Sequence, residues 1–477
     1  MFNNCDEFDN PGWCPDGEKD KHPFDKKPRA AKDYRPWSVR RLSPRNKPQA
    51  MHLRKLFTSL VLYFLFLVSP SEAWQTEPDI PSNSVRPDYS IPIVDLNNES
   101  EFHTVVAKDL DHSNQYLGHP TTVLMDDGNT IMAAFPTGHG RGKLRFRRSR
   151  DAGKTWQAMK APNVDLQETP TLFKTVKPDG KTRIVLTTCV PKTGEFRWMV
   201  SDDEGMSWSE IQSIDLELKR GIIVALASLW QVRDVNTGQP IHRWRGIFHD
   251  YGFDNYTIDL TYEKNAQALG GWETVWSAAR KIEFATPEGL NRARSAQLCE
   301  AGLVRSPDGK EIALLFRPQA KKTNAMISFS GDEGVSWSDP TELAGSLTGE
   351  RHVGRYAPDG RLLVCFRDYS PLNPGNPTHA DWVGWVGRWE DLKNGTEGEY
   401  RIRLKDNFGN STNNNVGDCG YTAIELAGDT FVCTSYGHWE LAKGQMDPNG
   451  KGRSPFIIST RFRLQDLEKP SRSFLKQ

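Results

Sequence analysis

The sequence predicts an all-β protein, namely a six-bladed β-propeller with four antiparallel strands in each blade. Two repeated patterns lead to this prediction. An octet of the form Ser-x-Asp-x-Gly-x-Thr/Ser-Trp begins at residues 149, 201 and 330. Hairpins with Asp-Gly or Gly-Asp at the turn, flanked by alternating apolar residues, recur along the chain. Repeats of about 50 residues, each holding several short strands, are typical of propeller blades.

Each octet predicts a tight turn followed by an aromatic anchor. Its carboxylate can accept hydrogen bonds from backbone N–H groups of the turn, its glycine can adopt a positive φ, and its tryptophan offers a large ring to bury. We therefore interpret the octet carboxylates as structural; they are Asp151, Asp203 and Asp332. A degraded fourth copy, TYEKNAQALGGW at 261–272, keeps the glycine and the tryptophan but has lost the aspartate.

The hairpins give the order of the blades. Five similar hairpins occupy residues 121–135, 171–186, 301–316, 353–366 and 421–433. A sixth unit, between the second and third of these, combines residues 225–240 with the short partner strand at 244–248. With two hairpins in each unit, the six units predict six blades of four strands.

The N-terminal region has a different composition. Residues 1–50 are polar and rich in proline and charge, which predicts disorder. Residues 51–73 have a basic start, an apolar run of about a dozen residues and a small-residue cleavage site, as in a secretory signal peptide. We expect Met51 to be the true start and the protein to be secreted or periplasmic. The alternative, a signal-anchor helix with a cytoplasmic tail, is disfavoured because the run is short.

The expected organisation follows from these segments. Its parts are a disordered extension (1–50), a signal peptide (51–73), an N-terminal lead-in (74–114), the propeller (115–467) and a C-terminal tail (468–477).

Composition excludes several classes of function. Lys plus Arg and Asp plus Glu both number 61, so no overall field favours nucleic acid. We find no C-x-x-C or H-E-x-x-H metal motif, P-loop or dinucleotide fingerprint, and no mature segment long enough to span a membrane. Five of the seven cysteines follow the extension, so at least one thiol is unpaired in a monomer. We expect a monomer without metal or other cofactor.

The octets and hairpin units resemble the sialidase (neuraminidase) superfamily over roughly residues 115–465; in that family the octets are called Asp boxes or BNR repeats. Non-enzymatic propellers such as sorting receptors also carry Asp boxes, so chemistry has to be inferred from the inner ends of the blades. In sialidases three arginines hold the substrate carboxylate, a tyrosine paired with a glutamate is the nucleophile, and an aspartate is the acid/base. A neutral phenol suits attack on an anionic sugar, which would repel a carboxylate nucleophile.

Two segments match this pattern. CEAGLVRSPDGKEIALLFR at 299–317 is similar to the family's fourth blade, which implies that Glu300 is the base and Arg317 binds the carboxylate. DCGYTAIE at 418–425 is similar to the opening of the sixth blade, which makes Tyr421 the nucleophile candidate. The alternatives are an ion pair at a blade mouth for the first segment and a core aromatic residue for Tyr421.

Two segments depart from the family. The first blade opens with LGHPTT where sialidases have Arg-Ile-Pro, so His119 stands near the position of the first arginine. The loop at 136–142, PTGHGRG, has no carboxylate where the family has its acid/base aspartate, and carries His139 and Arg141 instead. Histidine can exchange protons near neutral pH, so we expect His139 to take over this role. The alternative is a glycine-rich surface turn.

Other polar residues recur at the inner ends of the blades, as an anionic-sugar pocket requires. Together with Arg317, the substrate-binding candidates are His119, Arg141, Glu168, His249, Asp250, Arg351, His352, Arg367, Tyr436 and His438. Arg317, Arg351 and Arg367 could rebuild a carboxylate clamp.

The resemblance implies a secreted, exo-acting, sialidase-like glycoside hydrolase that removes a terminal acidic sugar from a glycan. One alternative is a hydrolase of another, uronate-type glycan on the same scaffold. A second is a non-catalytic carbohydrate-binding propeller, in which Tyr421 and Glu300 would not touch. A third, an interaction protein that uses the propeller face, leaves the ring of polar residues unexplained.

Overall fold

The structure is a computed structural model that describes residues 89–108, 115–162, 164–166, 168–369, 376–407, 418–439 and 455–468. All of them lie in the second of the chain's two compact units, Glu77–Gln477. The expectations for the extension, the signal peptide and almost all of the C-terminal tail concern residues outside these ranges. None of the helices in the described ranges is long and apolar enough to cross a membrane.

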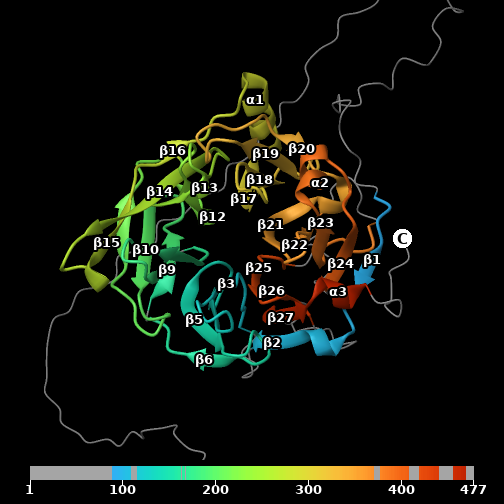
Figure 1. The fold of residues 1–477 in the computed structure, drawn as a ribbon, viewed down its shortest axis with the longest axis horizontal. Helices are drawn as coiled ribbons and strands as arrows, with labels where there is room; N and C mark the ends of the chain where they lie inside the picture. Colours follow the sequence, from blue (N-terminus) through green and yellow to red (C-terminus); the bar gives the residue numbers. More distant parts are fainter. Residues whose placement is uncertain are drawn as a thin grey trace, which may run out of the picture. The chain divides into compact units, whose positions relative to one another are not determined.

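Six antiparallel sheets form a ring, and the predicted six-bladed propeller is confirmed (Figure 1). Consecutive strands build each of the first four blades. Blade 1 consists of β3 (Thr121–Leu124), β4 (Ile131–Pro136), β5 (Gly142–Ser149) and β6 (Gln157–Met159), with β7 (Asp165–Leu166) also paired to β5. Blade 2 consists of β8 (Thr171–Val176), β9 (Thr182–Cys189), β10 (Glu195–Ser201) and β11 (Gln212–Asp215).

Blades 3 and 4 follow the same order. Blade 3 consists of β12 (Ile222–Arg233), β13 (Pro240–Asp250), β14 (Asn255–Lys264) and β15 (Trp272–Trp276), with β16 (Arg280–Lys281) also paired to β14. Blade 4 consists of β17 (Leu298–Arg305), β18 (Ile312–Pro318), β19 (Met326–Ser330) and β20 (Thr341–Glu342). The degraded octet at 261–272 joins β14 to β15, at the place of the true octets in blades 1, 2 and 4.

Strands that precede residue 115 complete the last two blades. Blade 5 consists of β21 (Gly349–Tyr356), β22 (Leu362–Asp368), β23 (Trp382–Gly387) and β24 (Tyr400–Lys405), to which β1 (Ile93–Asp95) adds in parallel. Blade 6 consists of β25 (Ala423–Ala427), β26 (Thr430–Gly437), β27 (Phe456–Phe462) and, outermost, β2 (His103–Ala107). The segment expected to be only a lead-in therefore belongs to the propeller. The reason is ring closure, because β2 covers the edge that β27 would otherwise leave unpaired.

The helices lie between or after strands. They are η1 (Ser100–Phe102), η2 (Leu269–Gly271), α1 (Pro287–Ala296), η3 (Gly345–Leu347), α2 (Trp389–Asn394) and α3 (Leu464–Leu467). Helix α1 begins at Pro287 after Thr286, whose side chain accepts the N–H of Gly289, and ends at Gln297 in a left-handed conformation. A threonine cap followed by proline is a common helix start. The threonine side chain accepts one N–H group of the first turn, and proline has no N–H group to pair.

Apolar side chains fill the spaces between neighbouring sheets. Between blades 2 and 3, for example, Val185 and Phe196 pack with Leu226, Phe248 and other buried residues. In blade 5, the Trp382 and Trp385 side chains are fully buried. Burying one such large side chain contributes about 2–3 kcal/mol. Stability thus comes from the blade interfaces, which leaves the inner strand ends available for polar residues.

The three octets form identical hydrogen-bonded turns between the third and outer strands. In the first, Ser149 Oγ donates to Asp151 Oδ1 (2.8 Å) and accepts the N–H of Gly153 (2.7 Å). The Thr155 N–H and hydroxyl donate to the two oxygens of Asp151, at 2.9 and 2.7 Å. The same contacts recur at Asp203 and Asp332. All three carboxylates are engaged in the turns that they begin.

Replacing Asp332 by alanine should lower the free energy of unfolding by roughly 1–2 kcal/mol, because the turn's N–H and hydroxyl donors lose their acceptor. Chemical denaturation measures this loss, and turnover per folded molecule should stay unchanged. Glu210→Ala, at an exposed position, is the matched control. A variant that unfolds normally but has lost turnover would contradict a structural role for Asp332.

His103 makes the ring closure sensitive to acid. Its Nε2 lies 2.8 Å from the Leu96 carbonyl oxygen and its Nδ1 lies 2.9 Å from Thr460 Oγ1 on β27. Burial, joined by the charge of Lys405 and opposed by the Leu96 carbonyl, lowers the pKa of His103 to about 4. The unfolded histidine has a pKa of about 6.5 and therefore takes up its proton first as the pH falls. Neutral His103 therefore stabilises the folded state fully above about pH 6.5, and this stabilisation is lost as the pH falls towards 4.

His103→Gln should remove this part of the pH dependence. Between pH 7 and 5, the free energy of unfolding of the variant should fall by about 2 kcal/mol less than that of the unchanged protein. Urea denaturation at a series of pH values measures the difference. Equal pH dependence in the two proteins would show that His103 does not titrate on unfolding.

Candidate active site

Four polar residues occupy the same position in four blades. His119, Glu300, Arg351 and Tyr421 each lie two residues before regular pairing of the inner strand begins or resumes, at Thr121, Gly302, Val353 and Ala423. In β17 and β21 one extra residue forms a bulge at this point. Bulges re-aim side chains, so these residues leave the strand alternation and meet at the inner end of the ring.

The backbone at three of these positions is left-handed. The φ angles are 53° at His119, 48° at Glu300 and 60° at Arg351. A non-glycine residue in this region costs on the order of 1 kcal/mol or more. The surrounding sheets hold the three residues in this conformation.

The Tyr421 hydroxyl donates a hydrogen bond to Glu300 Oε1. The other oxygen of Glu300 accepts one from Arg317 Nη1 at 2.8 Å. The guanidinium of Arg351 lies 4.9 Å from the centre of the Tyr421 ring. Residues of blades 4, 5 and 6 thus form one cluster that contains the expected nucleophile, its base and two of the expected arginines.

Charges fix the protonation of this pair. Burial alone would raise the pKa of Glu300, but Arg317, Arg351 and the hydrogen bonds from Tyr421 and Arg317 outweigh it and hold that pKa well below its usual range. Burial and the charge of Glu300 raise the pKa of Tyr421 well above its ordinary value, although Arg351 and Arg317 oppose this. The pair is therefore a neutral phenol that donates to a carboxylate.

Glu350, which the sequence analysis did not select, organises the arginines. It is only 2% exposed, and its two oxygens form ion pairs with different guanidinium groups. Arg317 Nε lies 3.2 Å from Oε1, and Arg367 Nε donates to Oε2 at 2.8 Å. Burial would raise the pKa of Glu350, but Arg367 and Arg317 outweigh it and lower that pKa. Two of the three expected clamp arginines are therefore already paired with carboxylates of the protein.

Arg351 differs from the other two arginines. Within the described parts of the chain it forms no ion pair, and its Nη1 is buried without a hydrogen-bond partner. The residue is 8% exposed. A buried guanidinium without a carboxylate is costly unless a ligand supplies one. Arg351 is thus the arginine best suited to receive an acid group.

A second carboxylate, Asp418, supplies the negative charge that the loop at 136–142 lacks. The hydroxyls of Tyr116 and Tyr436 donate to its two oxygens. His139 Nε2 lies 3.3 Å from Oδ2, and Arg367 Nη1 lies 3.8 Å from Oδ1. Burial would raise the pKa of Asp418, but the two tyrosine hydroxyls and the neighbouring histidines outweigh it and lower that pKa. Asp418 is the first residue of the segment at 418–425, but its partners lie far from it in the sequence, so the sequence did not indicate its role.

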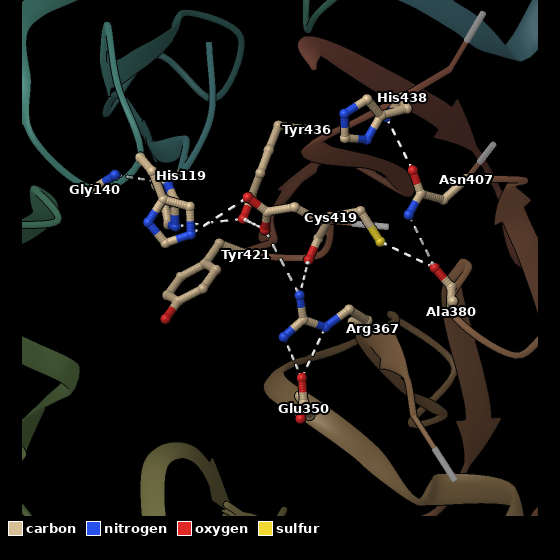
Figure 2. Close-up of polar contacts among 12 residues, drawn as sticks. His119, Gly140, Glu350, Arg367, Ala380, Asn407, Cys419, Tyr421, Tyr436 and His438 are labelled. Atoms are coloured by element: carbon tan, nitrogen blue, oxygen red, sulfur yellow. Dashed lines mark hydrogen bonds and ion pairs between the residues drawn. The ribbon is translucent and has the colours of Figure 1, made fainter. Parts of the chain in front are cut away.

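His119 connects this network to Tyr421 (Figure 2). Its Nδ1 accepts the Gly140 N–H at 3.2 Å, so the proton of the neutral ring lies on Nε2, which donates to Tyr436 Oη at 3.3 Å. Burial, with the charge of His139, lowers the pKa of His119 to about 3. Its ring centre lies 4.5 Å from that of Tyr421. Both ring nitrogens are used within the protein, so His119 orients Tyr421 and the loop at 136–142.

His139, Arg141 and Glu168 lie at the rim. The His139 side chain is 69% exposed, and its ring centre lies 4.6 Å from that of His119. A Cβ at Gly140 would lie 2.6 Å from Glu168 Oε1, so Glu168 borders the same loop. Burial raises the pKa of Glu168, opposed by hydrogen bonds from Thr169 and by the charge of Arg141. The loop therefore packs between His119 and Glu168 and leaves the His139 side chain open to solvent.

Two further substrate-binding candidates, His249 and Asp250, come from the end of β13. His249 is buried near the cluster, and burial lowers its pKa to about 4, opposed by Glu300 and reinforced by Arg351 and Arg317. Asp250 accepts the N–H groups of Gly252 and Asp254, at 2.7 and 3.0 Å, and so caps the turn between β13 and β14.

Two further candidates are held by other parts of the protein. His352 lines the same cavity as Tyr421, but it is 1% exposed, bonds the Leu347 carbonyl oxygen at 3.0 Å and packs on Phe366. Its ring is therefore fixed largely by contacts within the protein. The His438 N–H donates to Asn407 at 3.0 Å, on the far side of Tyr436 from Tyr421 (Figure 2).

A cavity of about 310 Å³ continues from the cluster along the inner strands. His119, Arg351 and Tyr421 line one part, and Thr122, Arg355 and Glu425 line another. Glu425 accepts from Thr122 Oγ1 at 2.9 Å. The described part of the chain holds no group of three or more histidines, cysteines, aspartates or glutamates that could bind a metal ion. Its five cysteines are buried and free.

Comparisons with known proteins support the fold. No family model matches the chain, and no curated protein matches it. A protein of unknown function from Dyadobacter fermentans has a similar structure, with a TM-score of 0.51, 15% identity and coverage of 76% of this chain and 97% of that chain.

Two characterised proteins show a weaker likeness. The intramolecular trans-sialidase from Ruminococcus gnavus has a TM-score of 0.46 and 12% identity, covering 76% of this chain and 98% of its own. An alpha-L-arabinanase from Penicillium chrysogenum has a TM-score of 0.45 and 9% identity, covering 80% and 99%. At such identities the likeness concerns the fold and leaves the activity to be argued from the site.

Proposed function

We propose that this chain is an exo-acting, sialidase-like glycoside hydrolase that removes a terminal acidic sugar from glycans. The hydrogen bond between the Tyr421 hydroxyl and Glu300 carries the proposal. A phenol held by a buried carboxylate is an activated nucleophile with its base in place. Because the phenol is neutral, it can approach an anionic sugar that would repel a carboxylate. We also propose export of the chain, because residues 51–73 have the form of a signal peptide.

Recognition of the acid group is assigned to Arg351. Arg317 and Arg367 are paired with Glu300 and Glu350, whereas Arg351 forms no ion pair among the described residues. A substrate carboxylate beside Arg351 would satisfy its buried donors and would lie next to Tyr421, over whose ring the guanidinium sits. The acid group thereby positions the anomeric carbon near the attacking oxygen.

Substrate binding also strengthens the base. In the free protein Glu300 is a weak base, because positive charges hold its pKa low. A substrate carboxylate bound at Arg351 would repel the charge of Glu300 and so raise the pKa of this base. The phenolic proton then passes to Glu300 as the oxygen of Tyr421 bonds to the anomeric carbon. A neutral sugar would leave the base weak.

His139 supplies the proton for the leaving group. As the bond to the aglycone breaks, its oxygen takes a proton from the His139 imidazolium. Water later attacks the anomeric carbon and gives a proton to His139, while the bond to Tyr421 breaks and its oxygen takes its proton back from Glu300. Asp418 cannot donate that proton, because its lowered pKa keeps it ionised. Its role is to orient the His139 ring and to stabilise the imidazolium, at an Nε2–Oδ2 distance of 3.3 Å.

Two alternatives remain distinct from this proposal. A uronate-type sugar also carries one carboxylate, so Arg351 would bind it equally well. This contact therefore does not distinguish a uronate from a sialic acid. A non-catalytic carbohydrate-binding propeller requires no contact between Tyr421 and Glu300, and their hydrogen bond therefore favours an enzyme.

Tyr421→Phe should abolish most turnover while leaving stability and sugar binding nearly intact, since only the attacking oxygen is lost. Glu300→Gln should slow the same step by about a hundredfold or more. Purified residues 74–477 can be assayed on aryl glycosides of sialic acids, uronic acids and neutral sugars. Full activity of Tyr421→Phe on the preferred sugar would rule out the tyrosine mechanism and favour a binding module.

His139→Gln should lose most activity on substrates with a poor leaving group but little on activated aryl glycosides, because the latter need no proton on departure. The limb of the pH–rate profile between about pH 5 and 8 should disappear. Asp418→Asn should lower turnover of the same substrates, since the His139 ring loses the contact that orients it. Arg150→Gln, at an exposed position outside the loop, is the control. If His139→Gln lost turnover equally on both types of substrate, His139 would not be the proton donor and the loop at 136–142 would have only a structural role.

A further inference from the structure

A groove of about 380 Å³ lies on the outer part of blade 1, away from the cluster around Tyr421. It follows strand β5 where the outer partners of that strand change. Strand β6 pairs with β5 from Phe146 to Arg148, and β7 pairs with it at Gly142 and Lys143. Between these pairs the edge of β5 is open, and residues 158–162 and Val164 form the opposite wall.

The groove is strongly basic. Lys143, Arg145, Arg147 and Lys160 line it, and none of its lining residues is acidic. Lys143, Arg145 and Lys160 form no ion pair among the described side chains, and Asp165 is the cross-strand partner of Lys143. Arg147 is held by the carbonyl oxygens of Val106 and Phe146, at 3.3 and 3.2 Å. Arg145 and Lys160 are therefore the cations of the recess that have no acidic neighbour among its lining residues.

This charge is local. The whole chain has 61 basic and 61 acidic residues, but residues 141–160 hold eight lysines and arginines and a single acid, Asp151. Asp151 is occupied by its turn. The repulsion among these cations is unfavourable unless an anion relieves it.

The spacing of the cations suits a chain-like anion. Lys143, Arg145 and Arg147 alternate along β5, so their side chains leave one face at intervals of about 6.6 Å. Leu144 and Phe146 point to the other face of β5 and are buried against blade 2, which fixes the strand that carries the cations. A row of cations at this regular spacing fits a polymer with regular acid groups.

The groove is continuous with the candidate active site along the chain. Strand β5 begins at Gly142, directly after the loop that carries His139 and Arg141. That loop is anchored to His119 through Gly140. We propose that the groove binds an acidic polysaccharide, carboxylated or sulfated, outside the catalytic pocket. The choice of a glycan over another polyanion rests on the proposed function, whereas the cationic groove does not.

The test measures binding in a Tyr421→Phe background, so that turnover does not interfere. Fluorescently labelled oligogalacturonate and a sulfated heparin-type oligosaccharide are the probes, with a neutral malto-oligosaccharide and single-stranded DNA for comparison. Lys143→Glu combined with Arg145→Glu should weaken binding of the acidic oligosaccharides at least about tenfold and lower the salt dependence of log Kd by about two. The matched control is Lys219→Glu with Lys310→Glu, two exposed lysines in other parts of the ring.

Each outcome is decisive. Unchanged binding by the Lys143/Arg145 variant, or an equal loss in the control, overturns the proposal. Equally tight binding of the neutral oligosaccharide does so too, and tighter binding of DNA assigns the groove to nucleic acid. Arg351→Ala should leave this binding intact; if it abolishes binding, the polymer lies in the catalytic pocket and the groove plays no part. Turnover of small aryl glycosides should be the same in the Lys143/Arg145 variant, which separates this proposal from the catalytic one.

Discussion

The pairing of β2 with β27 is the contact on which the rest of the structure depends. The site takes His119 from blade 1, Glu300 from blade 4 and Tyr421 from blade 6, and no two of these residues are neighbours in sequence. Their distances are fixed only because the ring is closed, and β2 closes it by supplying the outer strand of the last blade. Residues 103–107 therefore support the candidate site, and Val106 and Ala107 belong to the apolar cluster against which Tyr421 packs.

Within the closed ring, buried charges determine what the site can do. Glu350 occupies Arg317 and Arg367, and Glu300 takes the other side of Arg317. This leaves one guanidinium for a ligand and one carboxylate for proton transfer. The three arginines carry one positive charge more than Glu300 and Glu350 together. One acid group of a ligand would therefore balance the buried charges. The same charges explain the proposed preference for acidic sugars. They also explain why Glu300 is a weak base until such a sugar binds.

Local patterns predicted the fold, whereas contacts between blades could be predicted only where a family resemblance supplied them. The octets at Asp151, Asp203 and Asp332 contain their own hydrogen-bond partners within eight residues, so the turn could be inferred from spacing alone. Tyr421 and Glu300 were placed through a family resemblance. Glu350 and Asp418 were not selected, because their meaning depends on arginines, tyrosines and a histidine contributed by other strands and blades. The bulge in β21 that places Arg351 beside Tyr421 was also not predictable, because nothing in the local sequence pattern marks the one extra residue.

The left-handed backbone at His119, Glu300 and Arg351 has a consequence for how this protein tolerates change. Glycine would adopt these angles without strain, so a substitution that relaxes the backbone there also removes the chemistry. Selection for thermal robustness alone would thus favour glycine at these positions, and laboratory evolution without an activity screen would erode the site first. Stability and the proposed catalysis would therefore compete at three equivalent points of the ring.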